Sequence, residues 1–173
     1  MIPVNFQTND EFQLEHLKII LKDKFKYTDN KNSNFICHID FINHELKINF
    51  SNIKHGNFSL PINLDDLFNF FDEANSLINI SIFDLDYYPF KSQLLNINHS
   101  IMLTDIHNNI LLNLSLYKMG IEKVELYKII WPKDKEIILN KLDTHLTNLK
   151  NIVQDSFGIF PKIITKNKKI YIN

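Results

Sequence analysis

Arginine is absent from the sequence, and glycine and cysteine are scarce, with three and one in 173 residues. Because the glycines stand apart at Gly56, Gly120 and Gly158, the chain can form neither a P-loop nor a dinucleotide-binding glycine fingerprint. The single cysteine, Cys37, excludes intramolecular disulfides and thiolate metal clusters, and its apolar neighbours predict a buried, inert thiol. No apolar run approaches the length of about 18 residues that a membrane span needs, so we expect no membrane contact.

The sequence also lacks a secretion signal and a recognisable catalytic set of residues. The chain does not start with a basic region followed by an apolar one, so we expect a cytoplasmic protein. Seven histidines and twenty carboxylates are scattered, without a recognisable set of nucleophile, base and orienting group. The sequence therefore predicts no enzyme, and no metal or cofactor site. An apolar content of 45% and a charged content of 23% are typical of a globular protein with one average domain or two small ones.

The near-zero net charge of −1 hides an asymmetry along the chain. Residues 1–117 hold 8 lysines and 14 acidic residues, whereas residues 118–173 hold 11 lysines and 6 acidic residues. Such a split indicates a surface for an acidic partner in the last third. Chance in a lysine-rich composition is the alternative explanation.

A boundary is predicted around Ala74, Asn75 and Ser76, which gives a first domain over residues 1–75 and a second over residues 80–173. In the first domain, a helix begins after the cap residue Asn9 or Asp10. Its expected apolar face consists of Phe12, Leu14, Leu17, Ile20 and Leu21. The other predicted elements are a strand at 2–6, a turn at 30–34, strands at 35–41 and 46–50 joined through Asn43 and His44, a strand at 58–60 and a helix at 63–73.

The second domain is predicted to begin with strands at 80–85, 93–95 and 101–103. A first helix is capped by Thr104 and ended by Gly120, and a second covers residues 123–131. A third runs from 137 or 140 to 153, and a hairpin of strands 162–165 and 169–172 closes the chain. The fold class is therefore α+β: antiparallel strands, three helices and a hairpin wing form a winged helix-turn-helix after a small α/β domain.

The third helix has a core side and a polar side. Its predicted core stripe consists of Leu142, Leu146, Leu149, Ile152 and Val153, with His145 packed at the edge. The opposite side carries short hydrogen-bonding side chains suited to base edges or phosphates, flanked by two lysines: Thr144, Thr147, Asn148 and Asn151, with Lys141 and Lys150. Because the chain has 23 asparagines, their presence on this helix is weak support for DNA contact.

The terminal hairpin is strongly basic. Four lysines fall within eight residues that contain no acid: Lys162, Lys166, Lys168 and Lys169. A two-stranded ribbon with a cationic tip can lie on phosphates or in a minor groove. The alternative is a solvated hairpin whose lysines discourage pairing with other strand edges.

The sequence from about residue 80 onward resembles the DNA-binding effector domain of OmpR/PhoB-type response regulators, with an alphaproteobacterial-like variant of the third helix. Three segments carry the resemblance: Leu103-Thr104 before the first helix, residues 121–131 ending in Trp131, and residues 142–150 in the third helix. On the polar side of the third helix and on the hairpin, the residues expected to contact DNA are Lys141, Thr144, Thr147, Asn148, Lys150, Asn151, Lys166, Lys168 and Lys169. The resemblance also implies a loop that contacts RNA polymerase, with Lys133, Asp134 and Lys135.

Several positions depart from this family's pattern. Asn148 and Lys150 stand where the family has arginines, and Lys168 and Lys169 replace a glycine pair at the wing tip. Lysine offers a point charge and no bidentate fork, so base-specific readout is expected to be weaker or shifted onto the wing.

The N-terminal domain resembles a shortened, degenerate receiver. Residues 2–6 with the following helix match a receiver's start, and Leu60-Pro61 with helix 63–73 matches its end. An acidic pair is replaced by Gln7, Thr8 and Asn9, so phosphorylation is not expected, although Asp40 stands near the end of a strand. A receiver kept for dimerisation or partner contact and an unrelated small α/β domain both remain open.

The function predicted from these patterns is that of a bacterial DNA-binding transcriptional regulator of response-regulator type that works without phosphorylation. The expected partners are double-stranded DNA, RNA polymerase and a second copy bound through the N-terminal domain. The alternative is a protein-interaction module with a winged-helix fold that has lost specific DNA binding.

Overall fold

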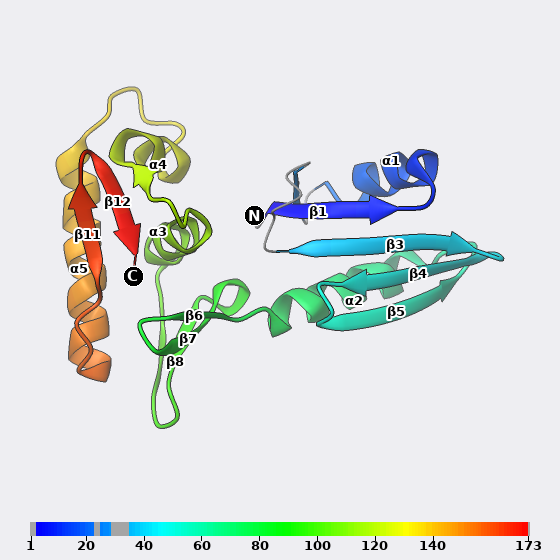
Figure 1. The fold of residues 1–173 in the computed structure, drawn as a ribbon, viewed down its shortest axis with the longest axis horizontal. Coiled ribbons are helices and arrows are strands. Elements are labelled where there is room, and N and C mark those ends of the chain that lie inside the picture. Colours follow the sequence, from blue (N-terminus) through cyan, green and yellow to red (C-terminus); the bar gives the residue numbers. More distant parts are fainter. Residues whose placement is uncertain (1–2, 23–24, 29–34, 173) are drawn as a thin grey trace. The chain divides into compact units, whose positions relative to one another are not determined.

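The computed structural model describes residues 3–22, 25–28 and 35–172 (Figure 1). The chain divides into two compact units, unit 1 over residues 1–77 and unit 2 over residues 78–173, and each is described by itself. The turn predicted at 30–34 lies outside the described residues.

Unit 1 is built on a 5-stranded sheet with the order β2-β1-β3-β4-β5. Its elements are β1 (Pro3–Thr8), α1 (Glu11–Ile20), β2 (Lys26–Tyr27), β3 (Ile36–Ile42), β4 (Glu45–Phe50), β5 (Lys54–Ser59) and α2 (Leu64–Leu77). β1 pairs in parallel with β2 and β3, whereas β3, β4 and β5 form an antiparallel meander. β4 therefore runs against the other strands of the sheet.

The turn from β3 to β4 confirms the predicted hairpin. Asn43 and His44 both have positive φ, at 49° and 64°. Positive φ at both central residues matches the right-handed twist of the flanking strands, and asparagine tolerates it better than most residues.

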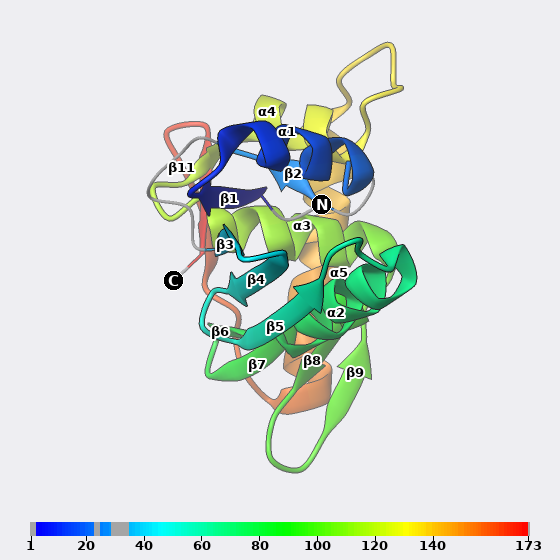
Figure 2. The same ribbon diagram turned by 90° about the vertical axis from the view of Figure 1, so that its right-hand side faces the viewer.

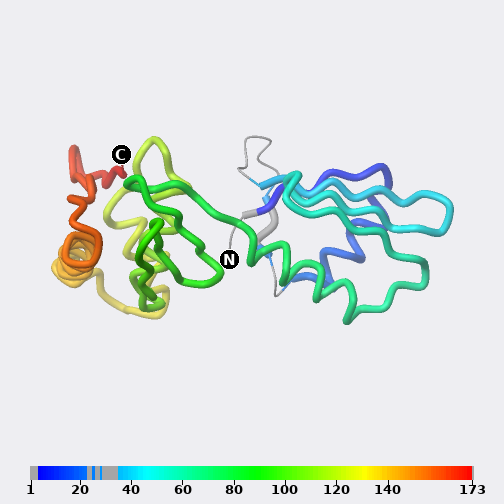
Figure 3. Tube along the Cα trace, turned by 90° about the horizontal axis from the view of Figure 1, so that it is seen from below, coloured from blue at the N-terminus to red at the C-terminus, as the bar shows by residue number. Residues whose placement is uncertain are grey.

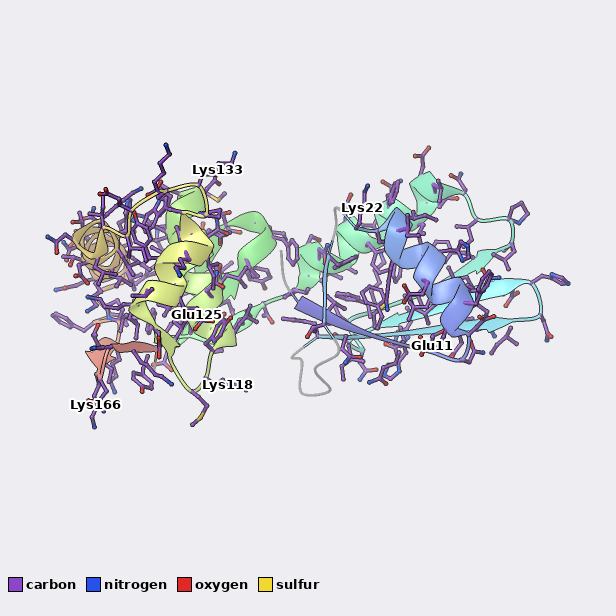
Figure 4. The ribbon with its side chains drawn as sticks, turned by 90° about the horizontal axis from the view of Figure 1, so that it is seen from above. Glu11, Lys22, Lys118, Glu125, Lys133 and Lys166 are labelled. Atoms are coloured by element: carbon purple, nitrogen blue, oxygen red, sulfur yellow. The ribbon has the colours of Figure 1, made fainter. Side chains whose placement is uncertain are left out.

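Both helices of unit 1 cover the same face of the sheet (Figures 3 and 4). Alternate strand residues on that face are buried, among them Cys37, Ile39, Leu46, Ile48 and Phe50. The ring of Phe71 from α2 packs against that of Phe25 at a centroid distance of 5.0 Å. On the other face of β3 and β4, His38, Asp40 and Lys47 are exposed, so this face of the sheet is mostly polar.

Two predictions for the helices of unit 1 were wrong in part. Phe12 and Ile20 are 71% and 40% exposed, because α1 turns a narrower face with Leu14 and Leu17 toward the sheet. The helix predicted over residues 63–73 is α2, which continues to Leu77, and its last turns bury Ala74 and Asn75.

Unit 2 is a mixed arrangement of helices and two sheets, which confirms the α+β class. Its elements are β6 (Ile80–Ile82), β7 (Leu85–Tyr88), η1 (Pro89–Lys91), β8 (Gln93–Leu95), β9 (Ser100–Met102), α3 (Asp105–Leu116), β10 (Ile121–Glu122), α4 (Lys123–Ile130), α5 (Leu139–Phe157), β11 (Ile163–Lys166) and β12 (Lys169–Ile172). One sheet is the antiparallel series β6-β7-β8-β9 (Figure 2), and the other has the order β10-β12-β11.

Three details of unit 2 differ from the prediction. The strand expected over 80–85 is a hairpin, because Phe83 and Asp84 adopt positive φ and turn β6 into β7. Gly120 does not cap α3: the cap is Tyr117, and Gly120 lies three residues later with a φ of 76°. α5 continues four residues beyond Val153, to Phe157, and Gly158 ends it in the left-handed conformation.

The core of unit 2 lies between α3, α4 and α5. Fully buried leucines from each helix meet there, including Leu111, Leu126 and Leu149. The side chain of Asn108 joins α3 to the first sheet, since its Oδ1 accepts from the Tyr87 hydroxyl at 2.7 Å and its Nδ2 donates to the Pro89 carbonyl at 2.9 Å. Within the described ranges, no helix is both long and apolar enough to cross a membrane.

Candidate functional site

The basic hairpin is fixed to the start of α4 by backbone pairing. The two-residue strand β10, which the sequence did not predict, pairs with β12 and places Ile121 opposite Ile170. Asn167 and Lys168 form the hairpin turn with φ values of 52° and 63°. The amide of Lys123, the first residue of α4, donates to the carbonyl of Lys168 at 3.0 Å. The hairpin tip therefore lies at the N-terminal end of α4.

The lysines of this hairpin differ in exposure. Lys162, Lys166 and Lys168 are exposed, and Figure 4 shows Lys166 projecting away from the unit. Lys169 is half-buried and stands opposite Glu122 across the β10–β12 pair. The tip therefore presents Lys166 and Lys168 most openly, whereas Lys169 has an acidic residue as its cross-strand neighbour.

The two sides of α5 have the character that the helical pattern predicts. Leu142, Leu146, Leu149 and Val153 are buried, and Ile152 is half-buried. On the other side, Thr144, Thr147, Asn148 and Asn151 are exposed, with Lys150 half-buried beside them. The hydroxyl of Thr144 donates to the carbonyl of Asn140 at 2.9 Å, one turn earlier in the chain. Thr147, Asn148 and Asn151 thus form the exposed polar face of this helix.

Lys141 does not belong to that exposed polar face. Its Nζ donates to Asp134 Oδ2 at 2.9 Å and lies 4.3 Å from the centroid of the Trp131 ring. The side chain therefore joins the first turn of α5 to the end of α4 and to the loop between them. It is half-buried, and its charge is neutralised within the protein.

Asp134 has a structural role in the loop expected to contact RNA polymerase. Besides Lys141, the hydroxyl of Tyr127 donates to Asp134 Oδ2 at 2.6 Å. The hydrogen bond from Tyr127, followed by that from Lys141, holds the pKa of Asp134 below its ordinary value. The same bond with Asp134 raises the pKa of Tyr127. Lys133 and Lys135 on either side are exposed, and in Figure 4 Lys133 and Lys166 project from different sides of unit 2.

A second ion pair, between Lys123 and Asp143, ties α4 to α5 next to the hairpin. The Lys123 Nζ lies 2.5 Å from Asp143 Oδ1, and its side chain is 19% exposed. Lys123 had no role in the sequence prediction, because a partner twenty positions away along the chain leaves no local signal. The pair holds the first turn of α4 near the N-terminal half of α5.

Unit 1 shows where the candidate phosphoacceptor lies. Asp40 is exposed on β3, and its cross-strand partner is Lys47 on β4. At the adjacent ends of β1 and β3, the side chain of Asn9 brackets the backbone of Phe41: its Nδ2 donates to the carbonyl at 3.2 Å, and its Oδ1 accepts from the amide at 3.0 Å. Asp10 caps α1 by accepting from the amide of Gln13. These two polar side chains are thus used in holding the strand ends and the helix.

Among the residues that the structure describes, no three histidine, cysteine or acidic side chains are placed to hold a metal ion. No protein-family model matches the chain, and no curated protein matches its sequence.

Proposed function

We propose that unit 2 is a winged helix-turn-helix domain that binds double-stranded DNA, with α5 as the recognition helix and β11–β12 as the wing. The observation that carries the proposal is the β10-β12-β11 order, with the basic turn bonded to the first residue of α4. This pairing brings the hairpin tip and the N-terminal half of α5, held by Lys123 and Asp143, to the same end of α4.

Two groups of exposed side chains would make the contacts. Thr147, Asn148 and Asn151 would face base edges or phosphates in the major groove, and Lys166 with Lys168 would contact phosphates beside it. Because Lys141 and Lys123 are each paired with a carboxylate, most of the phosphate attraction falls to the hairpin. The absence of arginine favours charge attraction over bidentate base readout.

The preceding elements agree with a regulator of the OmpR/PhoB type. In that reading, the sheet β6–β9 lies before α3, and unit 1 is a receiver reduced in size. Its strand order, 2-1-3-4-5, is that of the flavodoxin-like fold that receivers share. If tight turns replaced the helices after β3 and β4, the direction of β4 would be reversed and β5 would again run parallel to β3. This is the observed pattern.

The ends of β1 and β3 in unit 1 also favour regulation without phosphorylation. In flavodoxin-like sheets ligands bind beyond the carboxyl ends of the strands, at the switch point between β1 and β3. Here Asn9 closes that point by bonding to Phe41 in place of an acidic pair. We propose that unit 1 serves dimerisation or contact with a partner, and that the protein works in the cytoplasm.

The experiment that tests DNA binding is fluorescence anisotropy of the full chain with a generic duplex over a series of salt concentrations. Each phosphate contact contributes about −0.9 to the log–log slope, so contacts by Lys166 and Lys168 predict a slope of roughly −2 or steeper. The variant Lys166→Ala/Lys168→Ala/Lys169→Ala should flatten the slope by about 2. The charge-matched variant Lys22→Ala/Lys133→Ala/Lys135→Ala should keep it.

The result that refutes the proposal is an absence of binding at low salt, or equal loss of slope in both triple variants.

The second candidate function, a protein-interaction module, is favoured by the apolar side chains that α4 and the following loop expose. Val124, Ile129, Ile137 and Ile138 are each 40–52% exposed. Failure to bind duplex DNA would leave this surface as the better candidate.

A further inference from the structure

His107 is the most anomalous polar residue of unit 2. It lies on the inner side of α3 and is 7% exposed, and both of its ring nitrogens are buried without a hydrogen-bond partner. The Nδ1 of His145 on α5 is buried and unpartnered as well. Buried polar atoms in native proteins nearly always have a partner, so two neighbouring exceptions call for a physical account.

The two histidines face one another across the α3–α5 contact. Their ring centroids are 5.5 Å apart with an interplanar angle of 67°. The Trp131 ring lies 5.5 Å from that of His145 on a second side, and the Tyr127 ring lies 4.8 Å from Trp131. The histidine pair therefore belongs to an aromatic cluster in which α3, the end of α4 and α5 meet.

The surroundings of His107 favour a neutral imidazole ring over a protonated one. Burial lowers the pKa of His107, and the neighbouring His145 lowers it further because two positive rings would repel. No described carboxylate accepts a hydrogen bond from the His107 ring. Protonation would therefore place a cation in a buried site without compensation.

The charged and titratable groups on the surrounding elements do not supply that compensation. On α3 itself, Asp105 lies in the exposed first turn. On α4 and the following loop, Tyr127 donates to Asp134, which also pairs with Lys141 of α5. Asp143 of α5 pairs with Lys123, and Tyr87 of β7 with Asn108, while Lys169 and Tyr171 of β12 are half-buried. Lys150 of α5 is half-buried as well, and Glu125, Lys128 and Asp155 are exposed.

We propose that the His107–His145 pair makes the packing of α3 against α5 sensitive to acid, so that unit 2 loosens when the pH falls below neutral. The direction follows from linkage. An unfolded histidine titrates near 6.5, and a folded histidine held neutral binds its proton at a lower pH. Between the two values the unfolded state takes up more protons. The stabilisation is therefore complete above about pH 6.5 and is lost as the pH falls below it.

The consequence for DNA rests on the proposed function. His145 is followed one turn later by Asn148 and Leu149 on the same helix. If α5 packs less firmly, its exposed polar face is held less rigidly in the orientation that contacts DNA. Acidification would then weaken DNA binding. The histidine proposal itself concerns stability and is tested without DNA, so its failure and the failure of the proposed function can be told apart.

The test is urea unfolding of the full chain at pH 7.5, 6.5 and 5.5, followed by the fluorescence of Trp131, the single tryptophan, in buffer with a chelator. Each histidine that is neutral in the folded state raises the unfolding equilibrium constant by up to tenfold per pH unit below 6.5. We expect His107→Leu to lose most of this pH dependence. His99→Leu, a matched change at an exposed histidine of the same unit, should retain it. Equal pH dependence in the unaltered protein and in His107→Leu would overturn the proposal.

A second measurement needs no variant. NMR titration of the histidine ring protons in the unaltered chain should show that His107 takes up its proton below pH 6.5, the ordinary value for histidine. A His107 ring that takes up its proton at or above pH 6.5, with unit 2 still folded, would also overturn the proposal.

Discussion

Lys141 and Asp134 form an ion pair of 2.9 Å that closes the loop between α4 and α5. From the sequence, Lys141 was expected to contact DNA and Asp134 to contact RNA polymerase. In the structure, the two side chains bind each other. Tyr127 shares the carboxylate, and Trp131 lies under the lysine. The first turn of the proposed recognition helix is thus anchored to the preceding helix through a loop of exposed residues.

This anchor predicts coupling between the two residues. Asp134→Ala and Lys141→Met should each lower the midpoint of thermal unfolding of unit 2, and the double variant should fall less than the sum of the two. Methionine keeps an aliphatic stem over Trp131 and removes the charge. Asp134→Ala combined with Lys133→Ala should be additive, because Lys133 points elsewhere. Additive effects in the first pair would contradict the anchor.

The orientation of α5 can be tested by paired substitutions on its two sides. Leu149 is fully buried, so Leu149→Ala should lower the free energy of unfolding by about 2–5 kcal/mol. The exposed neighbour Asn148→Ala should change it by less than about 0.5 kcal/mol. Chemical denaturation followed by Trp131 fluorescence measures both. Similar losses at the two positions would show that the helix is rotated.

Gly120 and Gly158 offer a comparison of strain with and without steric contact. Both have positive φ, at 76° and 70°, which disfavours alanine by about 1–2 kcal/mol. A Cβ at Gly120 would also come within 2.5 Å of the Tyr171 ring, whereas nothing lies within 4 Å of one at Gly158. Gly120→Ala should therefore destabilise unit 2 more than Gly158→Ala, as measured by denaturant midpoint. The reverse order would contradict the packing of Tyr171 on this turn.

Cys37 reports on the core of unit 1. Its side chain is fully buried in β3, and burial raises the pKa of the thiol. A thiol reagent at pH 8 should label it slowly in the folded protein and at once in urea. Rapid complete labelling under native conditions would place the thiol at the surface and refute the described packing.

Some parts of this structure are readable from local patterns. The turns at Asn43 and Asn167 carry a residue that tolerates positive φ between two strand-like runs, and the period of leucines from Leu142 to Leu149 fixes the inner side of α5. In these places the local conformational preference of the residues agrees with their tertiary environment, so the sequence pattern alone predicts the structure.

Other parts depend on contacts between distant segments. β10 has two residues and exists because β12 lies beside it. The turn at Phe83 and Asp84 lacks the glycine or asparagine that marks most such turns. The pairing of Lys123 with Asp143 and the facing rings of His107 and His145 arise from the packing of three helices, which no single segment specifies.

We propose above all that α5 and the β11–β12 hairpin contact duplex DNA. Backbone amide chemical-shift mapping of the full chain titrated with a generic duplex tests it most directly. We predict that the largest changes fall on Thr147, Asn148, Asn151, Lys166 and Lys168, with residues 133–135 unaffected. Changes confined to α4 and residues 133–138, or no changes at low salt, would contradict the account.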